Sequence, residues 1–169
     1  MTRPEATGPF SRPVSVDRLR RSDGRIEVTA SPEECAALAQ DFEIPGIRDL
    51  VGTFETSGPP SAFRVRGTVT ALVTQVCTVS LDPFEATVSE PVDLLFTDTD
   101  QFAGTDAEDA DVPDPIVGGK IDFGTVTAEF LALGLDPYPR KPGITFEPHV
   151  EDQDEPPLAA LSALKPAND

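Results

Sequence analysis

The longest regular pattern in the chain is an alternation of apolar and polar residues from Phe63 to Leu81. One parity carries apolar or small residues, while the other carries mostly arginine and threonine. The alternation resumes after Asp82-Pro83 and continues from Phe84 to Phe96. Because successive side chains of a strand point to opposite faces of a sheet, the pattern predicts two long antiparallel strands joined by a turn at Asp82-Pro83.

Two residues within these strands carry further information. Cys77 shares the parity of the apolar residues, which predicts a small buried side chain. Pro91 cannot donate to a strand ladder, so it predicts an edge or a bulge in the second strand. An isolated strand pair is only marginally stable, and other elements must therefore cover its apolar face.

Shorter patterns predict those covering elements. Residues 25–29 and 47–56 alternate as half-buried strands do. Between them, Ser31 and Glu34 have the spacing of a capping box, and apolar residues at helical spacing predict a helix from Pro32 to Phe42. Residues 10–28 otherwise read as loop with short strands.

The last third of the chain predicts two more helices. Asp122 can cap a helix that ends near Gly134. The preceding residues 118–120 lack the first glycine and the final hydroxyl of a phosphate-binding loop, which indicates a turn. Within an acidic tail at residues 147–169, residues 157–164 predict a short apolar helix.

Together these patterns predict one α+β domain over residues 1–169, a length that is sufficient to bury a core. We expect an antiparallel, strongly twisted sheet with two main helices and a short C-terminal helix. Whether the sheet curls toward a barrel is left open by the sequence.

The net charge narrows the range of partners. Thirty acidic and thirteen basic residues give a formal charge of −17. Nucleic-acid affinity depends on neutralising phosphates, so most of this surface should repel RNA and DNA. A basic protein is the better electrostatic match. Six of the basic residues nevertheless gather in the first 25 positions: Arg3, Arg12, Arg18, Arg20, Arg21 and Arg25.

An acidic, turn-rich stretch at residues 97–115 lies far from that basic segment in sequence. Its low apolar content predicts a mobile loop. The spacing of its acids does not match a calcium-binding loop, so we expect no bound metal. Its candidate partner-binding residues are Asp98, Asp100, Asp106, Asp109 and Asp111.

The inventory of catalytic side chains is small. His149 is the only histidine, and a hydrolase would need it beside Cys77. Cys35 lies on the apolar stripe of the first predicted helix, which indicates packing. The sequence therefore favours a binding or assembly protein with no catalytic activity and no cofactor.

No run of about 18 apolar residues predicts a membrane span, and the N-terminal stretch lacks the apolar centre of a secretory signal. We expect the cytoplasm, with both cysteines as reduced thiols.

Three stretches of the chain resemble the YceD family, most of all its alphaproteobacterial form. They are VRGTVTALVTQVCTVSLDPFEATV, IDFGTVTAEFLALGLDPYPRKPG and PPLAALSALK. Many members carry a second cysteine at the position of Ser80, and such a pair would suit half a zinc site; a lone Cys77 needs three other ligands. The residues that carry the resemblance, with an expected structural role, are Gly67, Cys77, Leu81, Asp136, Pro137 and Pro142.

The resemblance implies a factor in large ribosomal subunit biogenesis that supports accumulation of 23S rRNA. Our hypothesis is that the acidic surface holds a ribosomal protein or a precursor particle. RNA contact is expected to be indirect, and Arg64, Arg66, Arg140 and Lys141 are available for phosphate contacts. The alternative is a regulator of rRNA processing or decay that binds RNA directly through residues 18–25.

Overall fold

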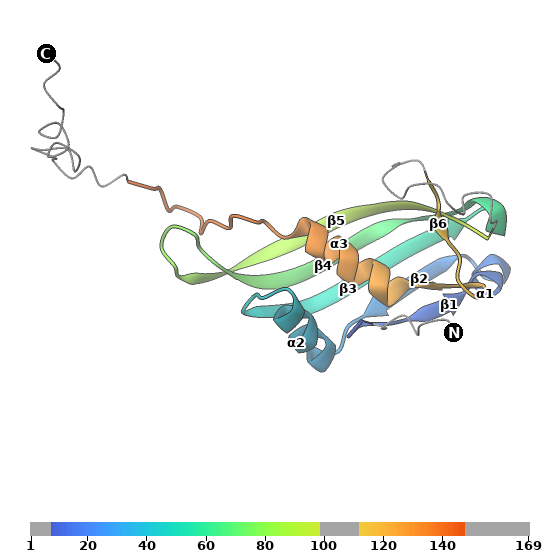
Figure 1. Ribbon diagram of the computed structural model, residues 1–169, viewed down its shortest axis with the longest axis horizontal. Coiled ribbons are helices and arrows are strands. Elements are labelled where there is room, and N and C mark those ends of the chain that lie inside the picture. The colour runs from blue at the N-terminus through green and yellow to red at the C-terminus, as the bar shows by residue number, and fades with distance from the viewer. Residues whose placement is uncertain (1–7, 99–111, 148–169) are drawn as a thin grey trace, which may run out of the picture.

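The structure is a computed structural model that describes residues 8–98 and 112–147. A curved sheet partly encloses one helix, and a second helix lies beside the sheet (Figure 1). In chain order the elements are β1 (Pro13–Ser15), α1 (Val16–Arg21), β2 (Arg25–Thr29), α2 (Pro32–Asp41), β3 (Gly46–Ser57), the 3-10 turn η1 (Pro60–Ala62), β4 (Phe63–Val76), β5 (Pro83–Thr97), β6 (Asp114–Pro115), β7 (Lys120–Asp122) and α3 (Phe123–Gly134).

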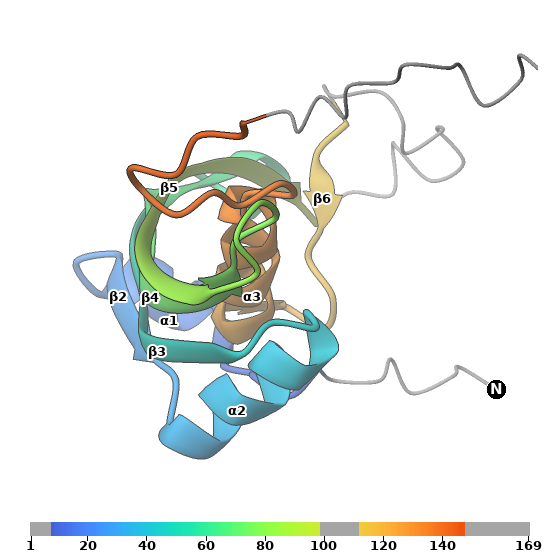
Figure 2. The same cartoon turned by 90° about the vertical axis from the view of Figure 1, so that its left-hand side faces the viewer.

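The predicted α+β class and the long strand pair are confirmed. Five strands pair in the order β2-β3-β4-β5-β6, and a separate antiparallel pair joins β1 to β7. β4 and β5 pair along their whole length, from Phe63 opposite Phe96 to Val76 opposite Pro83. The sheet curls around α3 (Figure 2) but does not close into a barrel, since β2 and β6 remain its two edges.

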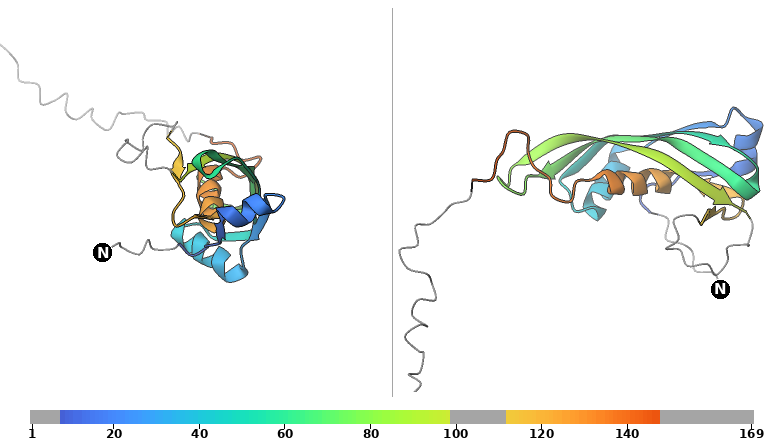
Figure 3. Two further views of the ribbon diagram at one scale, coloured as in Figure 1. Left: turned by 90° about the vertical axis from the view of Figure 1, so that its right-hand side faces the viewer. Right: turned by 90° about the horizontal axis from the view of Figure 1, so that it is seen from above.

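Helix α3 fills the concave face of the sheet (Figure 3). Asp122 caps it as predicted, and its Phe123, Val126 and Leu131 side chains are buried. The ring of Phe123 lies 5.2 Å from that of Phe54 on β3, measured between centroids. Apolar side chains of the sheet and of α3 thus form one shared core.

Helix α2 begins at the capping box that the sequence predicts. The Ser31 hydroxyl accepts from the Glu34 backbone N–H at 3.2 Å, and the Glu34 carboxylate accepts from the Ser31 N–H at 2.8 Å. Cys35 is buried against the core, as expected, and burial raises the pKa of its thiol.

One helix was missed. The sequence predicts loop and short strands for residues 10–28, whereas Val16–Arg21 form α1. Val16 and Leu19, three positions apart, are its only buried residues. A helix of six residues offers a single apolar pair, which is too few to display a helical period.

The predicted position of the hairpin turn was wrong by several residues. β4 ends at Val76, and the turn begins at Cys77, where the Leu81 backbone N–H bonds the Cys77 carbonyl at 2.9 Å. Leu81 therefore leaves the alternation, adopts a φ of 61° and is 73 % exposed. Its apolar parity is accidental, because the strand geometry has already ended.

The stretch at 97–115 is not loop throughout. Thr97 ends β5, and residues 114–115 form β6, which pairs with β5 in parallel, so the sheet is mixed at this edge. Apart from that short pairing, no described strand pairs with this side of β5, in agreement with the edge position predicted for Pro91. The predicted mobile loop at 99–111 and the predicted tail helix at 157–164 lie outside the described residues.

Candidate partner-binding surfaces

The turn between β4 and β5 is held by the segment that follows α3. The Gln75 side-chain amide donates to the Asp136 carbonyl at 3.1 Å, and the Thr78 backbone N–H donates to the Pro139 carbonyl at 2.8 Å. The Lys141 ammonium lies 3.7 Å from the Asp82 carboxylate. We call this contact between residues 75–82 and 136–141 the hairpin clasp.

Cys77 lies at the centre of the hairpin clasp. Its side chain is fully buried, and its sulfur lies 3.5 Å from the backbone nitrogen of Ser80. Hydrogen bonds from the backbone N–H groups of Ser80 and Lys141 lower the pKa of the Cys77 thiol to about 6. Cys77 is therefore more than a small packing residue, because a thiolate there accepts hydrogen bonds from both halves of the clasp.

The other residues of the family resemblance have structural positions. Gly67 lies where β3 and β4 approach closely: a Cβ on it would lie 2.0 Å from the Thr53 carbonyl oxygen. Leu81 ends the turn, and Asp136 accepts a bond from the Tyr138 N–H at 2.9 Å. Pro137 lies within the clasp, Pro142 directly follows it, and both are exposed.

The three comparisons with known proteins give one match. The family described as "Large ribosomal RNA subunit accumulation protein YceD" matches residues 65–165, more than half of the chain. The chain belongs to the YceD family. The matched residues include β4 from Val65 onward, β5, α3 and the hairpin clasp. Neither the curated proteins nor the solved structures contain a match.

The described helices of this YceD-family chain include none with the length and apolar character to cross a membrane. Among the described residues, no three histidine, cysteine, aspartate or glutamate side chains converge as a metal-binding group would.

The basic residues that the sequence assigned to phosphate contacts do not form one surface in this YceD-family chain. Arg64 and Arg66 lie on the outer face of β4 and share Asp93 on β5, with the two Arg64 contacts both at 2.7 Å and Arg66 at 3.4 Å. The Arg64 hydrogen bonds lower the pKa of the Asp93 carboxyl. Arg140 and Lys141 lie at the hairpin clasp, near the opposite end of β4.

The arginines of the basic N-terminal segment differ in their contacts: Arg12 is engaged within the fold, whereas those on α1 are exposed. Arg12 is structural, because its guanidinium pairs with Glu34 at 2.8 Å and stacks 4.8 Å above the Phe10 ring. Arg18, Arg20 and Arg21 are exposed on α1 and make no ion pair within the described part of the chain. They form a small basic surface. The sequence indicates these arginines as a basic cluster but does not predict that they lie on a helix.

A groove with acidic walls lies on the first half of α3. Its floor consists of Phe96, Ile121 and Val126, and its volume is about 670 Å³. Asp114 on β6 and Glu129 on α3 stand at its rim. We call it the acidic groove; Figure 2 shows β6 and the following segment beside α3.

Neither rim carboxylate forms an ion pair with a cation among the described residues. Partial desolvation raises the pKa of Asp114. Partial desolvation, and then repulsion from Asp114 and Asp122, raises the pKa of Glu129. By contrast, Asp122 is stabilised as a carboxylate by the donors that it caps: burial raises its pKa, but the hydrogen bonds outweigh this effect and lower it overall.

Sequence reasoning missed the acidic groove. Of the predicted acids, Asp98 is exposed just after β5, and Asp100, Asp106, Asp109 and Asp111 lie outside the described residues. Glu129 could have been found from its spacing, because it lies seven residues, about two helical turns, after Asp122 and so on the same face of the helix. Asp114 reaches the groove only through the parallel pairing of β6.

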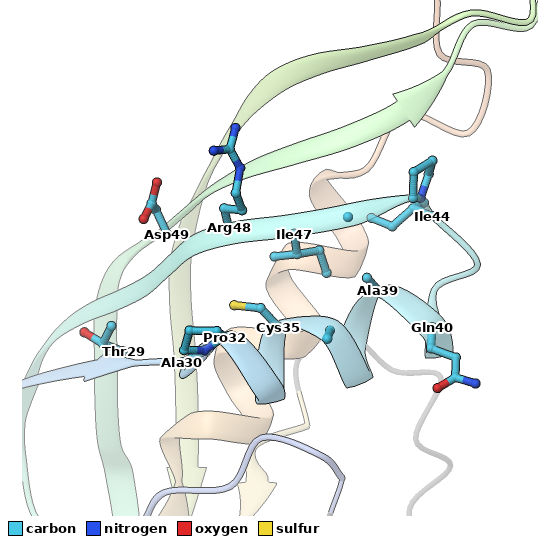
Figure 4. Close-up of a pocket in the computed structure, with 13 residues that line it drawn as sticks. Thr29, Ala30, Pro32, Cys35, Ala39, Gln40, Ile44, Ile47, Arg48 and Asp49 are labelled. Carbon is cyan, nitrogen blue, oxygen red and sulfur yellow. The ribbon is translucent and has the colours of Figure 1, made fainter.

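A second, more apolar pocket of about 730 Å³ lies between α2 and β3 (Figure 4). Cys35, Ile44 and Ile47 line it between the two elements, and Arg48 and Asp49 contribute to its lining from β3 with side chains that point away from α2. β3 has a bulge between Arg48 and Val51 beside this pocket, and Asp49 has a φ of 52° there. Arg48 is already paired with Glu85.

Proposed function

We propose that this protein is a non-enzymatic factor in biogenesis of the large ribosomal subunit. In this proposal it acts in the cytoplasm and supports accumulation of 23S rRNA by binding a basic ribosomal protein or a precursor particle. Membership of the YceD family supports the assignment to large-subunit biogenesis. The acidic groove is the observation that supports binding of a basic partner. Its rim carboxylates have no cationic partner among the described residues, and the whole chain has a charge of −17.

The environment of Cys77 supports a role without catalysis. A nucleophile must be reachable by its substrate, but this thiol is fully buried and accepts backbone hydrogen bonds within the clasp. The hydrolase reading requires His149 beside it, and His149 lies outside the described residues. A role in holding the hairpin accounts for Cys77 without a reaction.

The test is recovery of tagged protein from its host at low and high salt, with the proteins and the RNA in the eluate both identified. We expect large-subunit proteins or precursor RNA at low salt and their loss at high salt, because contacts between exposed charges are screened. A variant with Asp114→Asn and Glu129→Gln should recover less. Recovery of neither ribosomal proteins nor precursors at low salt would refute the proposal.

Direct binding of RNA is the second candidate function, and the exposed arginines of α1 favour it. It predicts affinity for protein-free RNA with a salt dependence that reflects several phosphates. Replacing Arg18, Arg20 and Arg21 by glutamine should abolish that affinity and leave binding of ribosomal proteins unchanged. If purified protein does not shift large-subunit RNA at low salt, this candidate is eliminated.

A further inference from the structure

The acidic groove combines two features that usually occur apart on a protein surface. Its floor of Phe96, Ile121 and Val126 is apolar, and the half-buried Leu94 also lines it. At its mouth Val117 is 61 % exposed, held there by a tight turn through Gly118 and Gly119, which have φ values of 58° and 71°. The groove thus presents apolar surface between separated carboxylates.

We propose that the acidic groove is the docking site for a segment of a basic protein in which lysine or arginine side chains flank an apolar side chain. The inference rests on the proposed function and specifies the chemistry of the partner. An apolar side chain would occupy the floor, and the flanking cations would meet Asp114 and Glu129 at the rim.

Charge complementarity identifies the occupant. Asp122 is already engaged, accepting from the Arg12 N–H at 2.6 Å and from two N–H groups at the start of α3. Asp114 and Glu129 have no such partners in the described chain, and Lys120, which also lines the groove, does not lower the pKa of either. A cation supplied from outside would relieve the repulsion between the rim carboxylates.

The same features argue against the other classes of ligand. RNA phosphates would be repelled by the rim carboxylates, and the chain as a whole carries a formal charge of −17. A hard metal ion prefers six or more oxygen ligands, whereas the floor is apolar. A peptide that alternates cationic and apolar side chains satisfies both the floor and the rim.

The experiment uses the full chain and a fluorescein-labelled peptide with two lysine-leucine-lysine triplets in a glycine-serine background. Fluorescence anisotropy at low salt measures its affinity. One control peptide replaces lysine by glutamine, and another replaces leucine by serine. We expect the wild-type protein to bind the lysine-leucine peptide more tightly than either control, because only that peptide matches both rim and floor.

Two double variants make the test specific to the groove. Asp114→Asn with Glu129→Gln should weaken binding about fivefold or more, since each charge pair contributes modestly at a partly exposed site. Glu27→Gln with Asp41→Asn removes the same charge from exposed positions outside the groove lining and should change the affinity less than about twofold. Circular dichroism establishes that each variant is folded.

The inference is overturned if the peptide does not bind, if both double variants weaken binding equally, or if leucine makes no difference. Competition by an RNA oligonucleotide that is lost in the groove variant would also overturn it, in favour of a nucleic-acid site. The recovery experiment described under the proposed function distinguishes failure of the groove assignment from failure of the proposed function. If ribosomal proteins are recovered but the groove variant retains them, only the groove assignment fails, whereas recovery of neither ribosomal proteins nor precursors removes the proposed function itself.

Discussion

Replacing Asp122 by alanine should destabilise the fold more than the loss of an ordinary helix cap. The carboxylate accepts from the Gly124 N–H at 3.0 Å and the Thr125 N–H at 3.1 Å at the start of α3. It also accepts from the Arg12 N–H at 2.6 Å and from the Ser11 hydroxyl. One side chain therefore joins the N-terminal segment to the central helix.

The expected loss can be worked from these contacts. Removing a helix cap costs about 1 kcal/mol. Each further hydrogen bond to a charged acceptor contributes about 1.5 kcal/mol, and some of that is recovered by water at this partly buried site. We expect about 3 kcal/mol for Asp122→Ala, or roughly 6–12 °C in Tm for a chain of this size. Asp122→Asn, which still caps, should cost about 1 kcal/mol.

The pH dependence gives an independent check. The pKa of Asp122 is lower in the folded protein than its ordinary value near 3.9. A lowered carboxyl pKa contributes stability above the unfolded value and loses it as the pH falls through the folded value. The difference between wild type and Asp122→Ala should therefore be largest near about pH 7 and smaller at about pH 2.5.

Urea unfolding followed by circular dichroism at both pH values measures these differences. Asp41→Ala is the matched control, because Asp41 is exposed at the end of α2 and should change stability by less than about 0.5 kcal/mol. A loss below about 1 kcal/mol for Asp122→Ala, or an equal loss at both pH values, would refute the reasoning.

Two further predictions concern β4 and the hairpin clasp. Gly67→Ala should cost about 3 kcal/mol or more in urea unfolding, because its Cβ would lie 2.0 Å from the Thr53 carbonyl; Gly46→Ala, at 3.5 Å from the Thr74 hydroxyl, is the control that should cost little. The thiolate absorbance of Cys77 should titrate near the pKa of about 6, and stability should fall as the pH drops from about 8.5 to 6. Cys77→Ala should remove that pH dependence and Cys35→Ala should keep it; persistence in Cys77→Ala would contradict the assignment.

The sequence predicted the elements that are half buried and long. β4 alternates from Phe63 to Val76 because one face meets α3 and the other meets solvent, so that apolar and polar side chains alternate along the strand. α2 was equally clear, since the capping box of Ser31 and Glu34 is local in sequence. By contrast, α1 is too short for its two buried residues to show a period.

The surface chemistry was less accessible from sequence. The ion pairs of Arg64 and Arg66 with Asp93 depend on the register of β4 against β5, which no local pattern encodes. The acidic groove gathers residues from β5, β6 and α3, so it exists only after the sheet has curled. The strand pattern predicted that Cys77 is buried, but its hydrogen bond from Lys141 joins residues 64 positions apart.

The central position of α3 has a consequence for the order in which the newly made chain can fold. The strands β2 to β5 are complete by Thr97, but the helix that covers their concave face ends at Gly134. At translation rates of about 5–20 residues per second, the apolar face of the sheet waits roughly 2–7 seconds for its cover. Val65, Val69 and Val73, all fully buried in the finished fold, lack that cover during this interval. A newly synthesised chain therefore leaves this apolar face without its helical cover until residue 134 has been made.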